Sequence, residues 1–391
     1  MPRTVPALLA VLLAAAPARA DVAMTAPAQG AALPAFQTTA PIALMVDMGS
    51  GRTLFARDER RRFIPASLTK IMTAYVAFEL IDAHRLGLDQ TMPVRDETWR
   101  QWHGKGTSMN LAEGSSVTVE DLLRGIVTVS ANDGCVVLAE GIAGDVPHFT
   151  TLMNAAAHHL GMPDTHYNTP NGWPDDGRTY VSAADLATLS SALISRHPGL
   201  YHRFFGHKDM TFNGVTQENF NPLYGVTAGA DGVKTGHTNE AGYGLVGSAE
   251  RDGRRLLMVV AGFDTLEARR NQSRAFIEWG YSAWETQPLF NAGVQVAEAR
   301  VQGGTDRMVG LLAPRDLRTV RPTGTRAGYG LTVRYRGPLT APLAKGQPVA
   351  TLVVHTDGQP DASLPLVAAN DVGRGGAIDR LRNGLFALAG L

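Results

Sequence analysis

Short strand patterns and longer helical patterns follow one another at the start of the chain. Residues 41–47 carry Ile, Leu and Val at every second position, which predicts a β-strand. A glycine-rich turn at 49–51 and the segment 53–56 predict a second strand that pairs with the first. A helix is predicted next, because Pro65 suits the approach to a first turn and an apolar run reaches Val76.

Helical periodicity dominates the middle of the chain. A pair of helices is predicted across residues 119–144, and a single helix is predicted across 149–160. Ser182 is a good N-cap for a further helix that ends near Ser195. Residues 82–110, by contrast, are expected to be rich in turns.

Strand patterns then return before a long helical pattern. One strand is predicted to begin at residues 233–235, a second to span 242–248 and a third to span 255–263. Residues 266–284 have helical periodicity. Strands and a helix therefore stand at both ends of a mostly helical insert. This order predicts an α/β domain, expected over residues 41–285, that its first and last segments close.

The pattern changes again beyond residue 285. Short alternating segments separated by Gly and Pro over 286–370 predict a small all-β domain, a sandwich. A glycine-rich break opens the last segment, 371–391, and residues 378–391 place Ile and Leu on one helical face. That helix is shorter than the roughly 20 residues that cross a bilayer, so we expect it to lie in a membrane surface rather than dock on its own protein.

The N-terminus has the features of an export signal. Residues 1–20 combine an early arginine, an apolar run and a small-x-small cleavage site, which indicates secretion rather than a membrane anchor. Residues 21–40 are rich in Ala, Pro, Thr and Gln and are expected to be a flexible lead-in. The mature protein is therefore expected in a bacterial periplasm.

Charge and cysteine content narrow the function classes. The 36 basic and 36 acidic side chains cancel, so no basic field favours nucleic acid. The single cysteine, Cys135, excludes an intrachain disulfide framework and a multi-cysteine zinc site, and it is expected to be a buried packing residue. The histidines lack metal-ligand spacing, so no metal or cofactor is expected.

Three short motifs carry candidate chemistry. Ser67 and Lys70 stand one helical turn apart, where a lysine that gives up its charge can activate a serine. Ser130 and Asn132 follow between two helical patterns, and Lys234-Thr235-Gly236 opens a late strand. Each motif alone is weak, but the ordered set on helix, loop and strand is far more specific.

With these motifs the chain resembles the penicillin-recognising serine DD-peptidases, and more narrowly the low-molecular-weight D-alanyl-D-alanine carboxypeptidases of peptidase family S11. The similar strings are Pro-Ala-Ser-Leu-Thr-Lys-Ile-Met-Thr, Val-Ser-Ala-Asn-Asp and Asp-Gly-Val-Lys-Thr-Gly-His-Thr. The resemblance covers roughly residues 41–285 and, more loosely, the β domain and last helix. It implies a DD-peptidase/β-lactamase-like antiparallel sheet with flanking helices and a helical insert.

The resemblance also implies a role for each motif residue in acyl transfer. Ser67 would attack the carbonyl of the terminal D-Ala-D-Ala bond, and Lys70 would take its proton and later activate water. Ser130 would relay a proton to the leaving amine. The backbone N–H groups of Ser67 and His237 would form the oxyanion hole, with the His237 imidazole as a pocket wall.

The other motif residues would bind substrate. Asn132 would hydrogen-bond the substrate amide, while a charged Lys234 and Thr235 would hold the terminal carboxylate. Gly236 would let the substrate backbone lie against the strand as an added β-partner. The implied ligands are peptidoglycan stem peptides and, as covalent inhibitors, β-lactams.

Alternatives remain at this point. A serine β-lactamase shares the motifs, but the best-known class uses a further glutamate, and neither Glu140 nor Glu218 stands midway between Ser130 and Lys234. A DD-endopeptidase and a catalytically silent wall-binding module are the others. The inner-membrane surface is an expected partner through residues 378–391, and the oligomeric state stays open.

Overall fold

The computed structural model contains two compact units, described separately below. One unit spans Leu33–Glu285, and the other contains the chain from Thr286 onward together with a short N-terminal strand. The residues that the structure describes are 22–24, 33–325, 328–356, 360–376 and 379. The expected export signal, and all of the expected last helix except Asp379, therefore lie outside the described residues.

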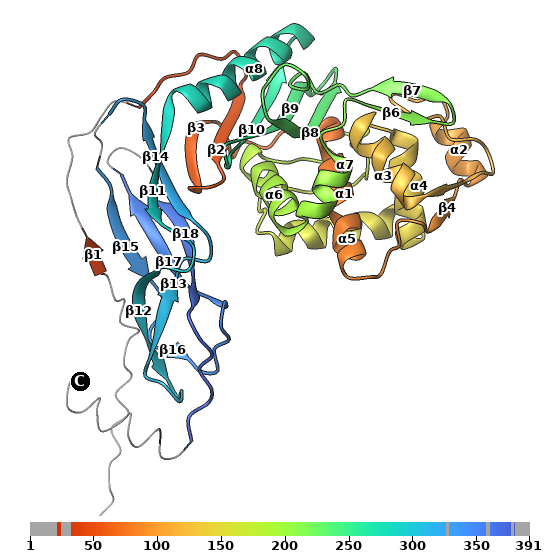
Figure 1. Cartoon of the computed structure of the whole chain (residues 1–391). Coiled ribbons are helices and arrows are strands. Elements are labelled where there is room, and N and C mark those ends of the chain that lie inside the picture. Colours follow the sequence, from red (N-terminus) through yellow and green to blue (C-terminus); the bar gives the residue numbers. More distant parts are fainter. Residues whose placement is uncertain (1–21, 25–32, 326–327, 357–359, 377–378, 380–391) are drawn as a thin grey trace, which may run out of the picture. The chain divides into compact units, whose positions relative to one another are not determined.

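A five-stranded antiparallel sheet forms the centre of the first unit, as predicted (Figure 1). Its strand order is β3-β2-β10-β9-β8, so the first two strands of the unit lie beside the last three. The bounds are β2 Ile42–Asp47, β3 Arg52–Arg57, β8 Ala230–Thr238, β9 Gly242–Arg251 and β10 Arg254–Phe263.

Successive side chains of the central strands point to opposite faces of the sheet, and each face packs against an apolar layer. Leu44 and Val259 join the core that the helical insert shares with one face of the sheet. Met45 points to the other face, where it lies against Gly280 of α8 (Leu266–Ser282). Both faces of the sheet are therefore covered, and this explains why β2 is almost continuously buried.

The helical insert lies on the face opposite α8 (Figure 1). The predicted helix pair at 119–144 is confirmed, and the helix predicted before Val76 begins later, at Lys70. The helices are α1 Lys70–Asp82, α2 Asp96–Trp102, α3 Val119–Thr128, α4 Asn132–Ala143, α5 Val146–His159, α6 Ala183–Arg196 and α7 Pro198–Phe204. Two strand pairs complete the insert, β4 Thr91–Pro93 with β5 Ser116–Thr118, and β6 Asp209–Phe212 with β7 Val215–Glu218.

Residues 82–110 are rich in turns, as expected, but they also contain β4 and α2, which the sequence pattern did not predict. Helix α2 has only seven residues, too few for a clear periodicity. Burial of Trp102 against the insert stabilises it instead.

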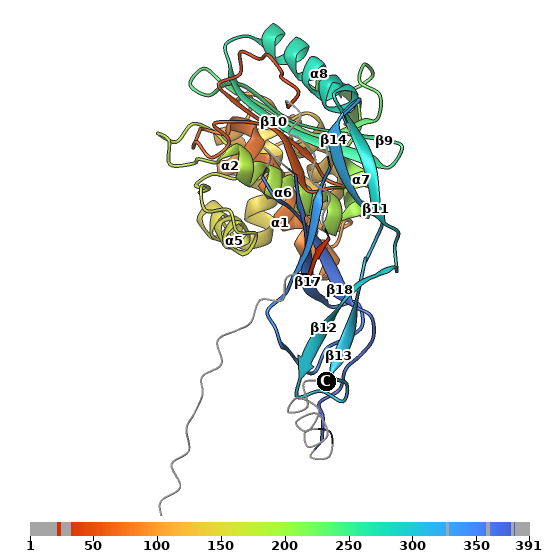
Figure 2. The same ribbon diagram turned by 90° about the vertical axis from the view of Figure 1, so that its left-hand side faces the viewer.

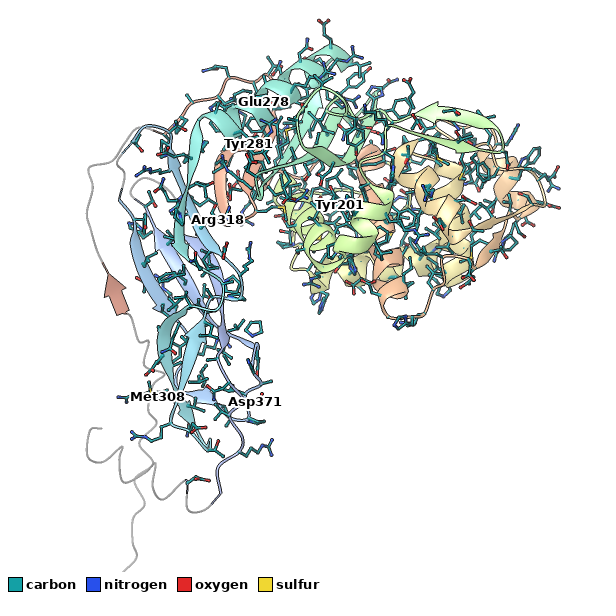
Figure 3. The ribbon with its side chains drawn as sticks, in the orientation of Figure 1. Tyr201, Glu278, Tyr281, Met308, Arg318 and Asp371 are labelled. Atoms are coloured by element: carbon teal, nitrogen blue, oxygen red, sulfur yellow. The ribbon has the colours of Figure 1, made fainter. Side chains whose placement is uncertain are left out.

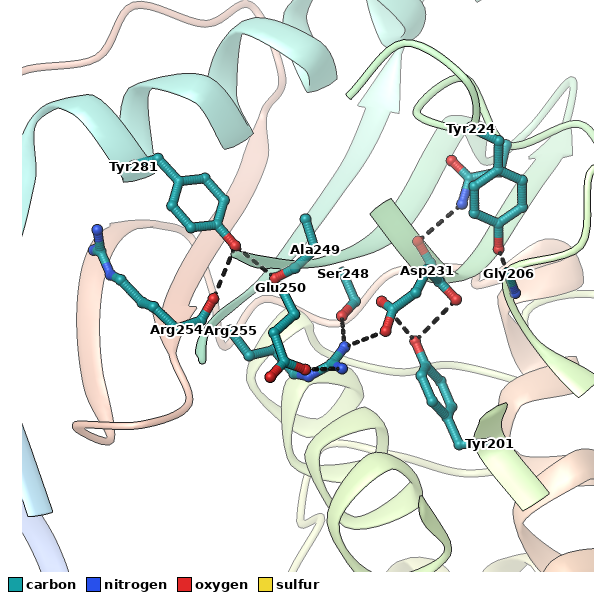
Figure 4. A network of polar contacts seen from close by, with 12 residues as sticks. Tyr201, Gly206, Tyr224, Asp231, Ser248, Ala249, Glu250, Arg254, Arg255 and Tyr281 are labelled. Atoms are coloured by element: carbon teal, nitrogen blue, oxygen red, sulfur yellow. Dashed lines mark hydrogen bonds and ion pairs between the residues drawn. The ribbon is translucent and has the colours of Figure 1, made fainter. Parts of the chain in front are cut away.

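A polar network fastens the start of β8 (Figure 4). Arg255 of β10 donates to Asp231 at 2.6 Å and to Ser248 of β9 at 2.7 Å. The Tyr201 hydroxyl, from α7, donates to the Asp231 carboxylate at 3.3 Å. Figure 3 shows Tyr281 on α8, whose hydroxyl donates to the carbonyl of Ala249 at 2.7 Å. Tyr201 of α7 and Arg255 of β10 thus hold Asp231 of β8, three residues before Lys234, and Tyr281 of α8 holds the neighbouring strand β9.

The expected flexible lead-in at 21–40 is partly wrong. Residues Val22–Met24 form strand β1, which pairs antiparallel with β15. Phe36 stacks on Phe276 of α8 with ring centroids 4.7 Å apart, so this part of the segment covers apolar surface of the first unit. Low-complexity composition did not predict these contacts, because both partners lie more than 200 residues away in the chain.

The second unit is all-β, as predicted, with a seven-stranded sheet of order β1-β15-β17-β18-β13-β12-β16 and a pair β11-β14. Figures 1 and 2 both show β17 and β18 side by side. The bounds are β11 Trp284–Phe290, β12 Gln295–Gln302, β13 Met308–Leu312, β14 Leu317–Pro322, β15 Gly330–Arg334, β16 Leu339–Thr340, β17 Pro348–His355 and β18 Ala362–Ala368.

The all-β unit continues past residue 370, where the sequence pattern placed the start of the last segment. Val372 is buried in the core of the unit and bridges Leu343, and Arg374 bridges Gly304. Residues 371–375 therefore belong to the β unit. Gly375, one of the glycines that suggested a break, packs closely against the chain here. A methyl group on it would lie 2.6 Å from the Gly304 carbonyl oxygen.

Candidate active site

Ser67 lies in a single 3-10 turn, Ala66–Thr69, that leads into α1. The turn still places Ser67 and Lys70 on one side, and Lys70 Nζ lies 2.8 Å from Ser67 Oγ. Ala66 has a φ of 48°, in the left-handed region that costs a non-glycine residue energy. Backbone strain directly before a candidate nucleophile is typical of functional sites.

Lys70 is fully buried and uses all three of its N–H donors. It donates to Ser67 Oγ, to Asn132 Oδ1 and to the carbonyl of Asn171, each at 2.8 Å. Burial lowers its pKa to about 8, although Cys135 and Asp133 act in the opposite direction. A lysine with this pKa is partly neutral near pH 8, as a general base must be.

Ser130 and Asn132 lie where α3 gives way to α4. Ser130 has a φ of 62°, and its carbonyl accepts a hydrogen bond from Thr107 Oγ1 at 2.6 Å. Asn132 Oδ1 is engaged by Lys70, and Asn132 Nδ2 donates to the carbonyl of Lys105 at 3.3 Å. The long second contact leaves Nδ2 able to meet a substrate carbonyl.

Asp133 was not singled out from the sequence, but it holds the loop that forms one wall of the site. Its buried carboxylate accepts hydrogen bonds from Ser108 Oγ and from the backbone N–H groups of Met109, Leu111 and Gly134. Three of these donors belong to residues 108–111, so the carboxylate fixes this loop in place. Cys135 is buried beside it, as predicted for a packing residue, and burial raises the pKa of its thiol to about 12.

Strand β8, at the edge of the sheet, brings the third motif to the same place. Lys234 is buried, and burial, with Lys70 as the second cause, lowers its pKa well below the ordinary value. The charge of Lys70 thus disfavours the protonated form of Lys234. Lys234 Nζ donates to the carbonyl of Thr235 at 3.1 Å.

Gly236 has a structural role in addition to the substrate-binding role expected from the sequence. A methyl group there would lie 2.8 Å from the Pro65 carbonyl oxygen and 3.2 Å from the Leu68 amide nitrogen. The missing side chain thus lets β8 close onto the turn that carries Ser67. His237, next in the strand, stacks on Tyr243 at 3.8 Å between ring centroids, as expected of a pocket wall.

A cavity of about 630 Å³ lies between these segments. Its lining includes the predicted residues Ser67, Ser130, Asn132, Thr235, Gly236 and His237. Lys70 and Lys234 lie behind the lining, and Lys70 reaches it through its contact with Ser67. Residues far apart in the sequence therefore meet at one cavity.

Arg269 also lines this cavity and was missed by the sequence argument. It comes from the first turns of α8, is 5% exposed, and its guanidinium lies over the Tyr243 ring at 5.6 Å. Burial lowers its pKa to about 10, and within the described part of the chain its Nε has no hydrogen-bond partner. A buried cation with an unused donor is a good site for a carboxylate.

Metal ligands are not gathered anywhere that the structure describes: no group of three His, Cys, Asp or Glu side chains could hold an ion. The same described residues contain no helix with the length and apolarity needed to cross a membrane.

Comparisons with known proteins assign the chain to a family. Residues 26–265 match the family model described as D-alanyl-D-alanine carboxypeptidase, and residues 284–374 match that of the penicillin-binding protein 5 C-terminal domain. The D-alanyl-D-alanine carboxypeptidase DacD of Salmonella typhimurium is 37% identical over 346 residues, which is 86% of this chain and 87% of the relative.

Solved structures give the same assignment. Penicillin-binding protein 5 from Haemophilus influenzae is 36% identical with a TM-score of 0.74, over 88% of this chain and all of that one. Penicillin-binding protein D2 from Listeria monocytogenes, solved in an ampicillin-bound form, is 30% identical with a TM-score of 0.58, over 63% of this chain and 99% of that one. On this evidence the chain belongs to the D-alanyl-D-alanine carboxypeptidases of peptidase family S11.

Proposed function

We propose that this serine carboxypeptidase removes the terminal D-alanine from peptidoglycan stem pentapeptides through an acyl-enzyme on Ser67. The observation that carries the proposal is the 2.8 Å contact between Ser67 Oγ and a fully buried Lys70 whose pKa is lowered to about 8. A serine needs a base within hydrogen-bond reach, and this lysine is both near enough and readily neutral.

In acylation, Ser67 Oγ attacks the carbonyl of the penultimate D-alanine while neutral Lys70 takes its proton. Backbone N–H groups of Ser67 and His237 stabilise the oxyanion. The C–N bond then breaks as Ser130 gives its proton to the departing D-alanine amine and regains one from Lys70, which leaves Lys70 neutral. Lys70 next takes a proton from water, and the resulting hydroxide attacks the ester carbonyl. The ester C–O bond breaks as this proton passes to Ser67 Oγ, which frees Ser67 and the shortened peptide.

Substrate placement follows from β8 being the edge strand of its sheet. An extended peptide can add to an edge strand by main-chain hydrogen bonds. Asn132 Nδ2 then meets the carbonyl of the amide that precedes the penultimate D-alanine. The terminal carboxylate lies near Thr235 and Arg269, and its charge raises the pKa of Lys234 and keeps that lysine protonated in the complex.

Slow deacylation would make the same serine a β-lactam target. Glu240 is the one acidic side chain among the described residues that line the cavity, and it stands on the turn after β8 rather than beside Lys70. The extra glutamate that the best-known class of serine β-lactamases uses for fast deacylation has no counterpart in this lining, so a penicilloyl group on Ser67 is expected to be hydrolysed slowly and to persist.

We further propose that the enzyme works in the periplasm of a bacterial cell, with residues 1–20 removed as an export signal. Residues 378–391 would attach it to the outer face of the inner membrane as an amphipathic helix. The β unit, proposed as a separate domain from about residue 286, would space the peptidase domain from that surface.

The test combines intact-mass measurement with product analysis. Purified protein given benzylpenicillin is expected to gain the mass of one penicilloyl group and to keep it for minutes, while a soluble pentapeptide loses only D-alanine. Rapid penicillin turnover without a lasting adduct would assign a β-lactamase, and cleavage of a cross-linked dimer with no D-alanine release would assign an endopeptidase. Neither an adduct nor release would indicate a silent wall-binding module.

A further inference from the structure

Trp173 leaves a large apolar surface open at the active-site cavity. The side chain lines the cavity and is 38% exposed, whereas its neighbour Trp102 is buried. The two indole rings meet edge to face, with centroids 5.3 Å apart. Burial of the free indole face would be favourable, so its position at the cavity points to an apolar part of the ligand.

The loop that carries Trp173 is held against the catalytic residues. Gly172 packs on the Ala66 backbone so closely that a methyl group there would lie 1.8 Å from the Ala66 carbonyl oxygen. The Asn171 carbonyl accepts a hydrogen bond from Lys70, and Asn171 Oδ1 accepts one from the Trp173 amide at 3.0 Å. The indole is therefore presented on a fixed base rather than on a free loop.

Gly106 links the indole to the amide-binding residue. A methyl group on Gly106 would come within 2.8 Å of Asn132 Nδ2 and 3.1 Å of Trp173 Cζ3. Asn132 and Trp173 thus border the same glycine from two sides. A group attached next to the substrate amide that Asn132 holds must begin beside the indole.

We propose that Trp173 forms the subsite for the side chain of the stem residue that precedes the two D-alanines, and that it favours a long aliphatic chain there. The inference rests on the proposed function, in which Asn132 holds the amide of that residue. Methylene groups that lie across the indole face gain dispersion and hydrophobic energy, whereas a methyl side chain is too short to cover it.

Two uncharged peptides test the subsite, diacetyl-L-lysyl-D-alanyl-D-alanine and acetyl-L-alanyl-D-alanyl-D-alanine. Release of D-alanine gives kcat/KM for each. The wild-type protein is expected to prefer the lysyl peptide by about tenfold, the factor given by roughly two buried methylene groups. In Trp173→Ala this ratio is expected to fall to within about twofold of one, while Trp173→Phe keeps most of it.

Phe220→Ala is the matched control. Phe220 is a second exposed ring in the cavity lining, 52% exposed, but it stands beside Asn221, which bonds the start of β8. Its removal is expected to leave the ratio as in the wild type. An equal loss of ratio in Phe220→Ala would overturn the assignment to Trp173, because the cavity would then select apolar side chains without a defined subsite.

Other outcomes separate the two proposals. An equal fall in kcat/KM for both peptides in Trp173→Ala would overturn the subsite, since the loop would then act through Asn171 and Lys70. Release from both peptides by the wild type without preference would overturn the subsite and leave the carboxypeptidase function standing. No release from either peptide would contradict the carboxypeptidase function, and with it the subsite.

Discussion

At the scale of single residues, the site combines two buried lysines with a serine that only one of them touches. Lys70 contacts Ser67 Oγ, whereas Lys234 Nζ donates to the carbonyl of Thr235. Burial lowers the pKa of both. The contact geometry therefore distinguishes the base from the electrostatic partner, and the pKa of Lys70 sets the pH range of the reaction.

The pH profile of kcat/KM should report Lys70. Its neutral form takes the proton of Ser67, so the rate is expected to rise about tenfold per pH unit below about pH 8 and to level off above it. Steady-state rates of D-alanine release across pH measure it, and a flat profile between about pH 6 and pH 9 would contradict a lysine base.

Replacement of Arg269 should remove recognition of the terminal carboxylate. Arg269→Ala is expected to lower kcat/KM on a pentapeptide about 10- to 100-fold, the value of one charge-assisted hydrogen bond. A pentapeptide with an amidated C-terminus, which cannot form this ion pair, serves as the control. Equal losses on the two peptides would show that Arg269 acts on the fold and not on the carboxylate.

The sequence predicted the residues whose partners are near in the chain or belong to a specific motif. Ser67 and Lys70 stand at a spacing that any helical turn brings together. Arg269 had no such signal, because it stands in a helix with a run of charged residues, and local patterns do not reveal its contact with the Tyr243 ring of β9. Asp133 likewise gains its role only from a loop that folds back onto α4.

At the scale of elements, β8 positions both the motif that it carries and the turn beside it. Gly236 lies directly against the backbone of Pro65 and Leu68, so strand and nucleophile turn are packed without an intervening side chain. The sequence predicted both elements but not this contact, since strand patterns do not specify what packs across them.

A methyl group at Gly236 should therefore disturb the nucleophile turn. Gly236→Ala places Cβ 2.8 Å from a backbone oxygen that has no flexible end to move, which is expected to cost about 1–3 kcal/mol in unfolding free energy and to lower activity. Gly199→Ala in α7 is the control, because a Cβ there meets open space. Thermal unfolding of both variants measures the effect, and equal midpoints would contradict the close packing.

At the scale of the whole molecule, the chain pairs a peptidase unit with an all-β unit. Strand patterns and turn signals predicted both, because alternation and glycine-rich turns are local features. They could not place the end of the β unit, where Val372 is buried through pairing with Leu343. A truncation must respect this pairing.

Deletion of residues 377–391 should release the protein from membranes without loss of activity. The deletion starts after Gly376 and keeps Gly375, whose amide bonds the Gly303 carbonyl at 2.8 Å, so the β unit stays intact. The expected result is a protein that no longer sediments with anionic vesicles and that releases D-alanine from a soluble peptide at the wild-type rate. A truncated protein that still sediments would mean that another surface binds the membrane.

The central claim is that Ser67 is the nucleophile of a carboxypeptidase. The most direct measurement is D-alanine release from a soluble pentapeptide ending in D-Ala-D-Ala, with the wild type and Ser67→Ala side by side. Loss of the hydroxyl removes only the group that Lys70 contacts at 2.8 Å, so release is expected from the wild type and to vanish in the variant. Release that continues in Ser67→Ala would contradict the account.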